Sequence, residues 1–271
     1  MNSPSIDQSR APKDSDLNCT VPLRSSSRAM ARPDLGCQHL AIVLDSSPLT
    51  THDRGAPGAL KSLPATAGSF WSALDDTIVC CLEHNVPCLS LILPHVDTTQ
   101  CDVAGCIKPP NCLFDFIRSE GRGLEQQGVK IRIIGDDNPE IHEFLREINN
   151  AEQPCGKKLL QLNLAINYDG RREVILALQH LADEIIRRDV ELSAIEASQL
   201  EQHLLTRDLP AVDLLLRTGG QTRLSQLPVW KSPYAELLFL EIPWSLFRRQ
   251  HLKLALSDYA SRHRTFGGLV K

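Results

Sequence analysis

The chain has 271 residues, of which 42% are hydrophobic and 23% charged, and this composition is typical of a globular protein with a sizeable core. Its formal net charge of −4 excludes the global basic field with which a nucleic-acid-binding protein attracts its partner. No apolar run reaches the roughly 18 residues that a membrane-spanning helix needs, so peripheral contact is the expected limit of any membrane association.

The first 36 residues are expected to form a disordered tail, followed by one domain over residues 37–271. The tail contains "SPSIDQSRAPKDSD", which has too few large apolar side chains to offset the entropy lost on ordering. It also lacks the apolar segment of a signal peptide. No linker rich in Gly, Ser or Pro interrupts the rest of the chain, which favours a single domain.

Short apolar runs alternate with longer amphipathic segments after the tail. The apolar runs are predicted strands: 39–45, 88–94, 129–135, 159–167, 211–217 and 235–242. The segments between them are predicted helices: "FWSALDDTIVCCLEH", "NPEIHEFLREINNAE", "RREVILALQHLADEIIRRD" and "EASQLEQHLLT". This alternation predicts an α/β fold with a mostly parallel central sheet.

The nine cysteines are scattered and odd in number, and no two of them form a CxxC pair. We expect mostly buried thiols in a reducing compartment, and therefore a cytoplasmic protein. A zinc site built from Cys101, Cys106 and Cys112 is disfavoured because their spacing fits no common structural zinc pattern.

Two predicted strands end in residues that carry chemistry, and ligands of parallel sheets bind at the carboxyl ends of strands. Asp45 follows the first strand directly. A lone carboxylate there either caps the next turn or binds a hard metal ion. Arg217 ends the fifth strand and opens the segment "RTGGQTRLS".

This segment predicts an anion site. Arg217 and Arg223 supply two guanidinium groups, and Ser225 supplies a hydroxyl. Gly219 and Gly220 would let backbone amides approach a phosphate or diphosphate. The alternative is a solvated turn whose arginines pair with carboxylates, but two arginines this close to a buried strand favour the anion. The segment is not a P-loop, because no GK[ST] is present.

Glu236 begins the sixth predicted strand. It is either an edge charge or a partner of Asp45 in a magnesium site. Mg²⁺ bound to a diphosphate usually takes one or two protein carboxylates together with water, so two such residues would suffice.

Three segments, in their order and spacing, resemble the cis-prenyltransferases, the family of undecaprenyl and dehydrodolichyl diphosphate synthases. They are "LNLAINYDGRREV", "DLLLRTGGQTRLSQLPVWKSPYAELLFLEIPW" and "RHRTFGG". The resemblance covers roughly residues 38–268. It implies a parallel sheet of about six strands flanked by helices, an elongated apolar tunnel, an isoprenoid diphosphate substrate and a dimer. We expect a homodimer and leave a heterodimer open.

The resemblance also implies roles for single residues. Arg217, Arg223 and Ser225 match the positions that bind the diphosphate of isopentenyl diphosphate. Asp45 and Glu236 match the positions that bind Mg²⁺.

The C-terminal segment has an implied role as well. Its residues Arg264, Gly267 and Gly268 match a stretch that reaches into the neighbouring subunit's site, with Phe266 between them.

The chain departs from the family at the positions that bind the allylic primer. The family follows its aspartate with Gly-Asn-Gly-Arg-Trp, but here Ser46 and Pro48 replace the glycines and Leu49 stands at the arginine. Pro48 has no N–H to donate. Thr98 replaces an asparagine after the second strand, and Gln221 replaces the glutamate of Arg-Thr-Gly-Gly-Glu. The positions for isopentenyl diphosphate and the metal are retained.

Three functions follow from this pattern. The first is a Mg²⁺-dependent synthase that ionises one short prenyl diphosphate and rearranges or cyclises it, as a terpene synthase does. The second is ordinary prenyl transfer, with chain elongation by isopentenyl diphosphate. The third is a non-catalytic subunit that supports an active homologue. We favour the first, because a silent subunit would be expected to lose all its sites and this chain retains one set.

Overall fold

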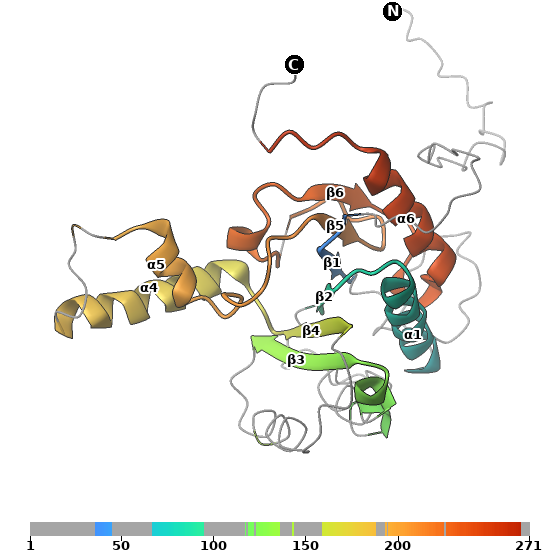
Figure 1. Cartoon of the computed structure of the whole chain (residues 1–271), viewed down its shortest axis with the longest axis horizontal. Helices are drawn as coiled ribbons and strands as arrows, with labels where there is room; N and C mark the ends of the chain where they lie inside the picture. The colour runs from blue at the N-terminus through green and yellow to red at the C-terminus, as the bar shows by residue number, and fades with distance from the viewer. Residues whose placement is uncertain are drawn as a thin grey trace, which may run out of the picture. The chain divides into compact units, whose positions relative to one another are not determined.

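The computed structural model describes residues 36–44, 67–94, 117, 119–121, 123–135, 143, 159–187, 193, 195–224 and 226–266 (Figure 1). All of them belong to the unit that runs from Ala31 to Lys271. None of the helices in these ranges is long and apolar enough to cross a membrane.

Six strands form one sheet in the order β3-β4-β2-β1-β5-β6, and every neighbouring pair is parallel. Their bounds are β1 His39–Val43, β2 Cys88–Ile92, β3 Val129–Gly135, β4 Leu160–Ile166, β5 Leu214–Arg217 and β6 Glu236–Phe239. Each lies within a predicted apolar run, so the predicted α/β fold with a parallel central sheet is confirmed. The apolar tunnel stays a prediction.

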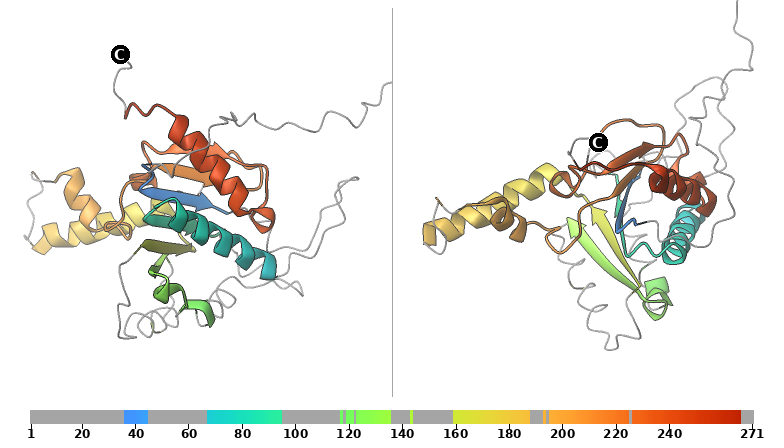
Figure 2. Two further views of the ribbon diagram at one scale, coloured as in Figure 1. Left: turned by 45° about the vertical axis from the view of Figure 1, so that its right-hand side comes forward. Right: turned by 45° about the horizontal axis from the view of Figure 1, so that its top comes forward.

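Helices cover one face of the sheet. There, α1 (Ala67–Glu83) packs beside α6 (Arg249–Ser261) and the short 3₁₀ helix η4 (Trp244–Leu246) (Figure 2). Away from them, α4 (Gly170–Arg187) packs against α5 (Ala197–Gln202) and the 3₁₀ helix η3 (Val229–Lys231). The predicted helix "NPEIHEFLREINNAE" lies outside the described residues, except for Glu143.

The side chains of β1 alternate between two cores, as the pleat of a strand requires. Leu40 and Ile42 belong to the larger hydrophobic cluster, which they share with α1 and α6. Ala41 and Val43 belong to a second cluster on the opposite face. Because all four side chains are completely buried, β1 lies in the interior of the molecule and its sequence reads as an unbroken apolar run.

Four of the cysteines lie in the described ranges, and each is a buried thiol that forms no disulfide: Cys37, Cys80, Cys81 and Cys88. Burial raises the pKa of the Cys37 thiol to about 12 and that of Cys80 to about 11. Since the thiolate is the reactive form, these side chains act as small hydrophobes, which confirms the prediction for these four.

A buried polar chain crosses the centre of the sheet. His39 is 1% exposed, its Nδ1 lies 2.8 Å from the carbonyl oxygen of Pro210, and its Nε2 lies 2.8 Å from Oγ of Ser90. A carbonyl only accepts, so Nδ1 carries a hydrogen. Burial disfavours the charged imidazole and lowers its pKa below the usual value. In the neutral ring, Nε2 then accepts from the Ser90 hydroxyl, to which Asn163 Nδ2 also donates at 3.2 Å.

We expect acid to destabilise the protein through His39. In the unfolded chain the imidazole of His39 binds a proton near pH 6.5, whereas in the folded protein it stays neutral at that pH. The free energy of unfolding therefore falls as the pH drops below 6.5. Chemical denaturation between pH 5.5 and 7.5 measures this slope. The variant His39→Asn should lower the slope by up to about 1.4 kcal/mol per pH unit, the effect of one proton. The matched control is His263→Asn, which replaces an exposed histidine and should leave the slope close to that of wild type. Identical slopes for wild type and His39→Asn would contradict the assignment.

Candidate active site

The carboxyl ends of the three strands β1, β5 and β6 meet at one edge of the sheet. In the register of the sheet, Arg217 at the end of β5 lies between Val43 of β1 and Phe239 of β6. The amide of Thr218 donates to the carbonyl of Val43 at 3.2 Å, which continues the pairing by one residue. Asp45 lies outside the described residues, two positions beyond Val43 in the chain. The strand that leads to it thus ends beside Arg217.

Arg217 is 4% exposed, and its Nη2 donates to Oε1 of Gln221 at 2.6 Å. Gln221 is the residue that replaces a glutamate of the family. Because an amide is neutral, this bond orients the guanidinium group without neutralising its charge. From the sequence, Gln221 was notable only because it replaces the family's glutamate. Its contact with Arg217 was not predicted.

Two glycines shape the turn after β5, with left-handed φ angles of 75° for Gly219 and 69° for Gly220. A Cβ atom on Gly220 would lie 2.6 Å from Oε2 of Glu241. Their amides do not face a ligand: Gly219 donates to the carbonyl of Ile242 at 3.0 Å, and Gly220 donates to that of Leu240 at 2.9 Å. The prediction that these amides bind a diphosphate is therefore wrong. These two hydrogen bonds connect the turn after β5 to the segment that follows β6.

Arg223 follows the turn and is exposed. It has no carboxylate partner among the residues that the structure describes. Ser225 lies outside those residues. Within the described residues, Arg223 therefore does not match the alternative of a turn whose arginines pair with carboxylates.

Glu236 lies at the opposite edge of the sheet. It begins β6, where it is in register with Leu214 at the start of β5, while Arg217 is in register with the end of β6. Its Oε2 accepts from Nη1 of Arg262 at 3.0 Å. In a parallel sheet all strand starts share one edge, so Glu236 lies a strand length away from the carboxyl end of β1. The prediction that it shares a magnesium ion with Asp45 stays a prediction, because Asp45 lies outside the described residues. In the described ranges, no three His, Cys, Asp or Glu side chains gather into a metal site.

Arg264 is engaged within its own chain. Its Nη1 lies 2.5 Å from Oδ1 of Asp213, the residue before β5. Gly267 and Gly268 lie outside the described residues. The contribution of this segment to a partner's site stays a prediction.

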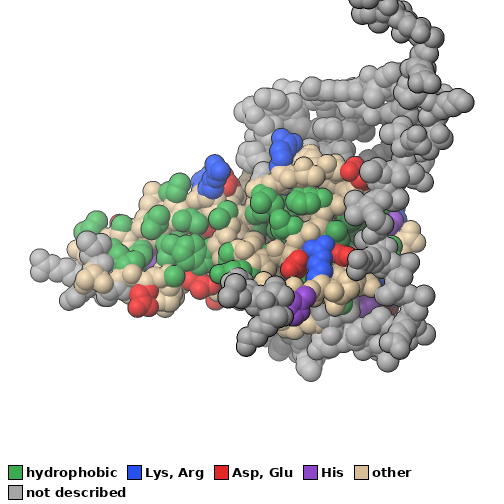
Figure 3. Space-filling model, turned by 90° about the horizontal axis from the view of Figure 1, so that it is seen from above, with side chains coloured by type: hydrophobic (Ala, Val, Ile, Leu, Met, Phe, Trp, Pro, Cys, Tyr) green, Lys and Arg blue, Asp and Glu red, His purple; other side chains and the backbone are tan. Residues whose placement is uncertain are grey.

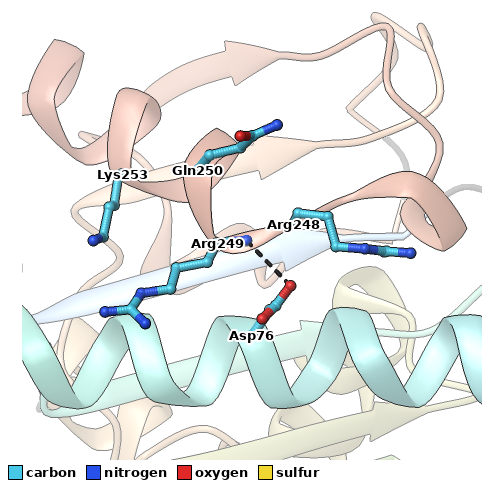
Figure 4. Close-up of a pocket in the computed structure, with 5 residues that line it drawn as sticks. All are labelled: Asp76, Arg248, Arg249, Gln250 and Lys253. Atoms are coloured by element: carbon cyan, nitrogen blue, oxygen red, sulfur yellow. Dashed lines mark hydrogen bonds between the residues drawn. The ribbon is translucent and has the colours of Figure 1, made fainter.

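A second group of cations lies in a surface depression of about 530 Å³ between α1 and α6 (Figure 4). Glu83 forms ion pairs with Arg249 and, at 3.8 Å, with Lys253. Figure 4 shows the side chains of Arg248 and Arg249 pointing in opposite directions. Because these cations are partly neutralised and do not converge, the depression is not a second diphosphate site. Its lining residues are Asp76, Arg248, Arg249, Gln250 and Lys253.

The sequence matches the family model described as "Putative undecaprenyl diphosphate synthase" over residues 71–267. Two similar curated proteins are named ditrans,polycis-undecaprenyl-diphosphate synthase ((2E,6E)-farnesyl-diphosphate specific). The protein from Pseudomonas putida is 31% identical over 242 residues, which cover 88% of this chain and 93% of the relative. That from Pseudomonas aeruginosa is 32% identical over 235 residues, covering 85% and 90%.

Solved structures share the fold. Lavandulyl diphosphate synthase from Lavandula x intermedia, crystallised with dimethylallyl diphosphate, superposes with a TM-score of 0.71 at 22% identity and covers 87% of this chain and 100% of its own. A probable undecaprenyl diphosphate synthase from Campylobacter jejuni gives a TM-score of 0.61 at 25% identity, covering 85% and 98%.

Proposed function

Because the chain belongs to the undecaprenyl diphosphate synthase family of cis-prenyltransferases, we propose that it is an enzyme that uses prenyl diphosphates and that it acts on a single short one. In this proposal the substrate loses its diphosphate, and the allylic cation that remains rearranges or cyclises. The alternative is cis-prenyl chain elongation with isopentenyl diphosphate. The names of the two Pseudomonas relatives, which are 31% and 32% identical to this chain, are what supports this alternative.

The observation that carries the proposal is the contrast between two sets of positions. Arg217 is buried at the carboxyl edge of the sheet, where Gln221 accepts a hydrogen bond from it, and Arg223 follows it on the same loop. The primer positions instead hold Pro48, Leu49 and Thr98, which offer no guanidinium group and one backbone amide fewer. One diphosphate can be bound by charge-assisted hydrogen bonds, whereas a second would depend on other residues.

The two arginines would act on the leaving group. As the bond between carbon and oxygen breaks, negative charge builds up on the diphosphate, and fixed guanidinium groups stabilise that charge more than they stabilise the bound substrate. Ser225 would donate its hydroxyl hydrogen to the same group. Arg217 is the better oriented of the two arginines, because its guanidinium group is hydrogen-bonded to Gln221 and its side chain is buried at the end of β5.

A magnesium ion would neutralise the departing diphosphate when bound. Asp45 is the protein ligand that we assign to it within the subunit, with diphosphate and water oxygens as the other ligands. Glu236 lies at the opposite edge of the sheet, where it pairs with Arg262, so we assign it no role in binding this ion within the subunit.

A test with candidate substrates distinguishes the three possible functions. The purified protein is incubated with Mg²⁺ and with geranyl, farnesyl or geranylgeranyl diphosphate, each without isopentenyl diphosphate. Released diphosphate is measured, and products are identified by mass spectrometry. We expect release from one of these substrates alone, and loss of that release when the metal is chelated. Release only when isopentenyl diphosphate is present would favour chain elongation. No turnover under any condition would favour the non-catalytic subunit.

A further inference from the structure

The loop that carries Arg223 is held at both of its ends. At its start, the amides of Gly219 and Gly220 donate to carbonyl oxygens of the segment that follows β6, at 3.0 and 2.9 Å. At its end, the side chain of Leu227 is 8% exposed and belongs to the second hydrophobic cluster. The exposed Arg223 lies between these two attachments. The position of its guanidinium group therefore depends on where both ends of the loop are fixed.

The end of the loop lies directly against Gly170, the buried first residue of α4. A Cβ atom on Gly170 would lie 1.9 Å from the carbonyl oxygen of Leu227 and 3.0 Å from the amide nitrogen of Val229. Both are backbone atoms, so neither can turn aside as the end of a flexible side chain can. Gly170 belongs to the segment "LNLAINYDGRREV", to which the proposed function assigns no role. The two segments touch backbone to backbone, which only a glycine permits.

The start of α4 is firmly held, so an added side chain would displace the loop rather than the helix. Glu173, in the first turn of α4, is only 2% exposed. Its Oε1 accepts from the amide of Thr206 at 2.8 Å, and its Oε2 accepts from the hydroxyl of Tyr168 at 2.5 Å. Moving the helix would break the hydrogen bonds of a buried carboxylate, which is more costly than moving an exposed loop.

The chain after this contact is fixed as well. Lys231, the last residue of η3, is 6% exposed, and its ammonium group forms an ion pair with Glu201 of α5. Its carbonyl oxygen accepts from the amide of Val212 at 2.7 Å. Because both the helix and the chain beyond η3 are held, a displacement at Gly170 passes back along the loop towards Arg223.

We infer that Gly170 is a positioning residue: its lack of a side chain admits the end of the loop, and this contact sets where Arg223 presents its guanidinium group. The inference rests on the proposed function, in which Arg223 binds the diphosphate of the substrate. Gly170 acts through the loop and not on the substrate directly.

Two variants disturb the contact from its two sides. Gly170→Ala adds the Cβ atom that displaces the loop, whereas Leu227→Ala removes the buried side chain that holds it. The matched controls are Gly123→Ala, where an added Cβ meets no atom within 4 Å, and Leu181→Ala, which removes a leucine of α4 that is 2% exposed. Both leucine variants lose a buried side chain, so a difference between them reports on the loop. Leu227→Ala decides the test alone if Gly170→Ala does not fold.

Two measurements on the full-length protein follow the loop and the diphosphate site separately. Brief trypsin digestion should cut after Arg223 at least ten times faster in Gly170→Ala and Leu227→Ala than in wild type or either control, because a loop that has lost an attachment opens more often. The Kd of inorganic diphosphate, measured by calorimetry with Mg²⁺, should rise at least fivefold in the same two variants. Added to Arg223→Ala, Gly170→Ala should leave the Kd unchanged, since it acts through Arg223.

The outcomes distinguish this inference from the proposed function. Cleavage after Arg223 at the wild-type rate in Gly170→Ala and Leu227→Ala, or equally fast cleavage in Leu181→Ala, would overturn the inference whatever the protein catalyses. Faster cleavage with an unchanged Kd would overturn the link to the diphosphate site. A wild type that binds no diphosphate, with variants that are cleaved faster, would contradict the proposed function and leave the effect of Gly170 on the loop in place.

Discussion

Replacing Arg223 with alanine is expected to lower kcat/KM for diphosphate release by roughly 10- to 150-fold while the melting temperature stays unchanged. The side chain is exposed, so its loss leaves no cavity, whereas each charge-assisted hydrogen bond to the diphosphate contributes about 1.5–3 kcal/mol. Arg217 should give a similar loss. Because Arg217 is 4% exposed, the conservative Arg217→Lys is the better variant, since it keeps the charge and loses the planar fork that binds diphosphate oxygens in pairs.

The matched control for these variants is Arg207→Ala. Arg207 is 55% exposed and pairs with Asp208, away from the strand ends. Steady-state kinetics of all three variants, with thermal unfolding alongside, measure the effect. Wild-type rates in both Arg217→Lys and Arg223→Ala would remove the diphosphate cluster from the proposed site.

The second large effect concerns the predicted dimer, whose interface we expect to include an apolar stripe on α4. Ile175, Leu178 and Ile186 are 56%, 50% and 78% exposed, and their spacing of three and eight residues places them along one face of the helix. Figure 3 shows hydrophobic side chains gathered over the part of the molecule that α4 and α5 form. A stripe of this kind on a helix is typical of a surface that another protein covers.

We expect Leu178→Glu to weaken the predicted dimer by at least about 30-fold, because burying an unpaired charge at the centre of an interface costs about 2 kcal/mol or more. Sedimentation equilibrium at micromolar concentration measures the change. The control is Gln179→Glu, an exposed position next to Leu178 in the same helix. A wild-type protein that sediments as a monomer would contradict the dimer, and a Leu178→Glu variant that dimerises normally would place the interface elsewhere.

The strands could be predicted from the sequence because this sheet is covered on both faces. The residues of β1 and β2 are buried at every position, so consecutive apolar residues mark the strands without the need for alternation. Their parallel direction followed from the helical segments between them. Their order in the sheet, with β1 between β2 and β5, did not, because it depends on which faces pack together.

The candidate site could be predicted only in part. That Arg217 lies at the carboxyl edge follows from its place at the end of a strand. Glu236 was expected there too, although the start of a parallel strand lies at the opposite edge. The amides of Gly219 and Gly220 were assigned to a ligand, because the sequence does not reveal that the chain after β6 returns to accept from them. Long-range contacts of this kind carry no local signal.

The most direct test of a single-substrate enzyme uses labelled isopentenyl diphosphate. The purified protein is incubated with Mg²⁺, farnesyl diphosphate and the labelled compound, and the products are separated by chain length. We expect diphosphate to be released from a short allylic substrate and no label to enter the product, because Pro48, Leu49 and Thr98 do not supply the donors of a second diphosphate site. Labelled cis-polyprenyl products would contradict this account, since they require a primer site built from other residues.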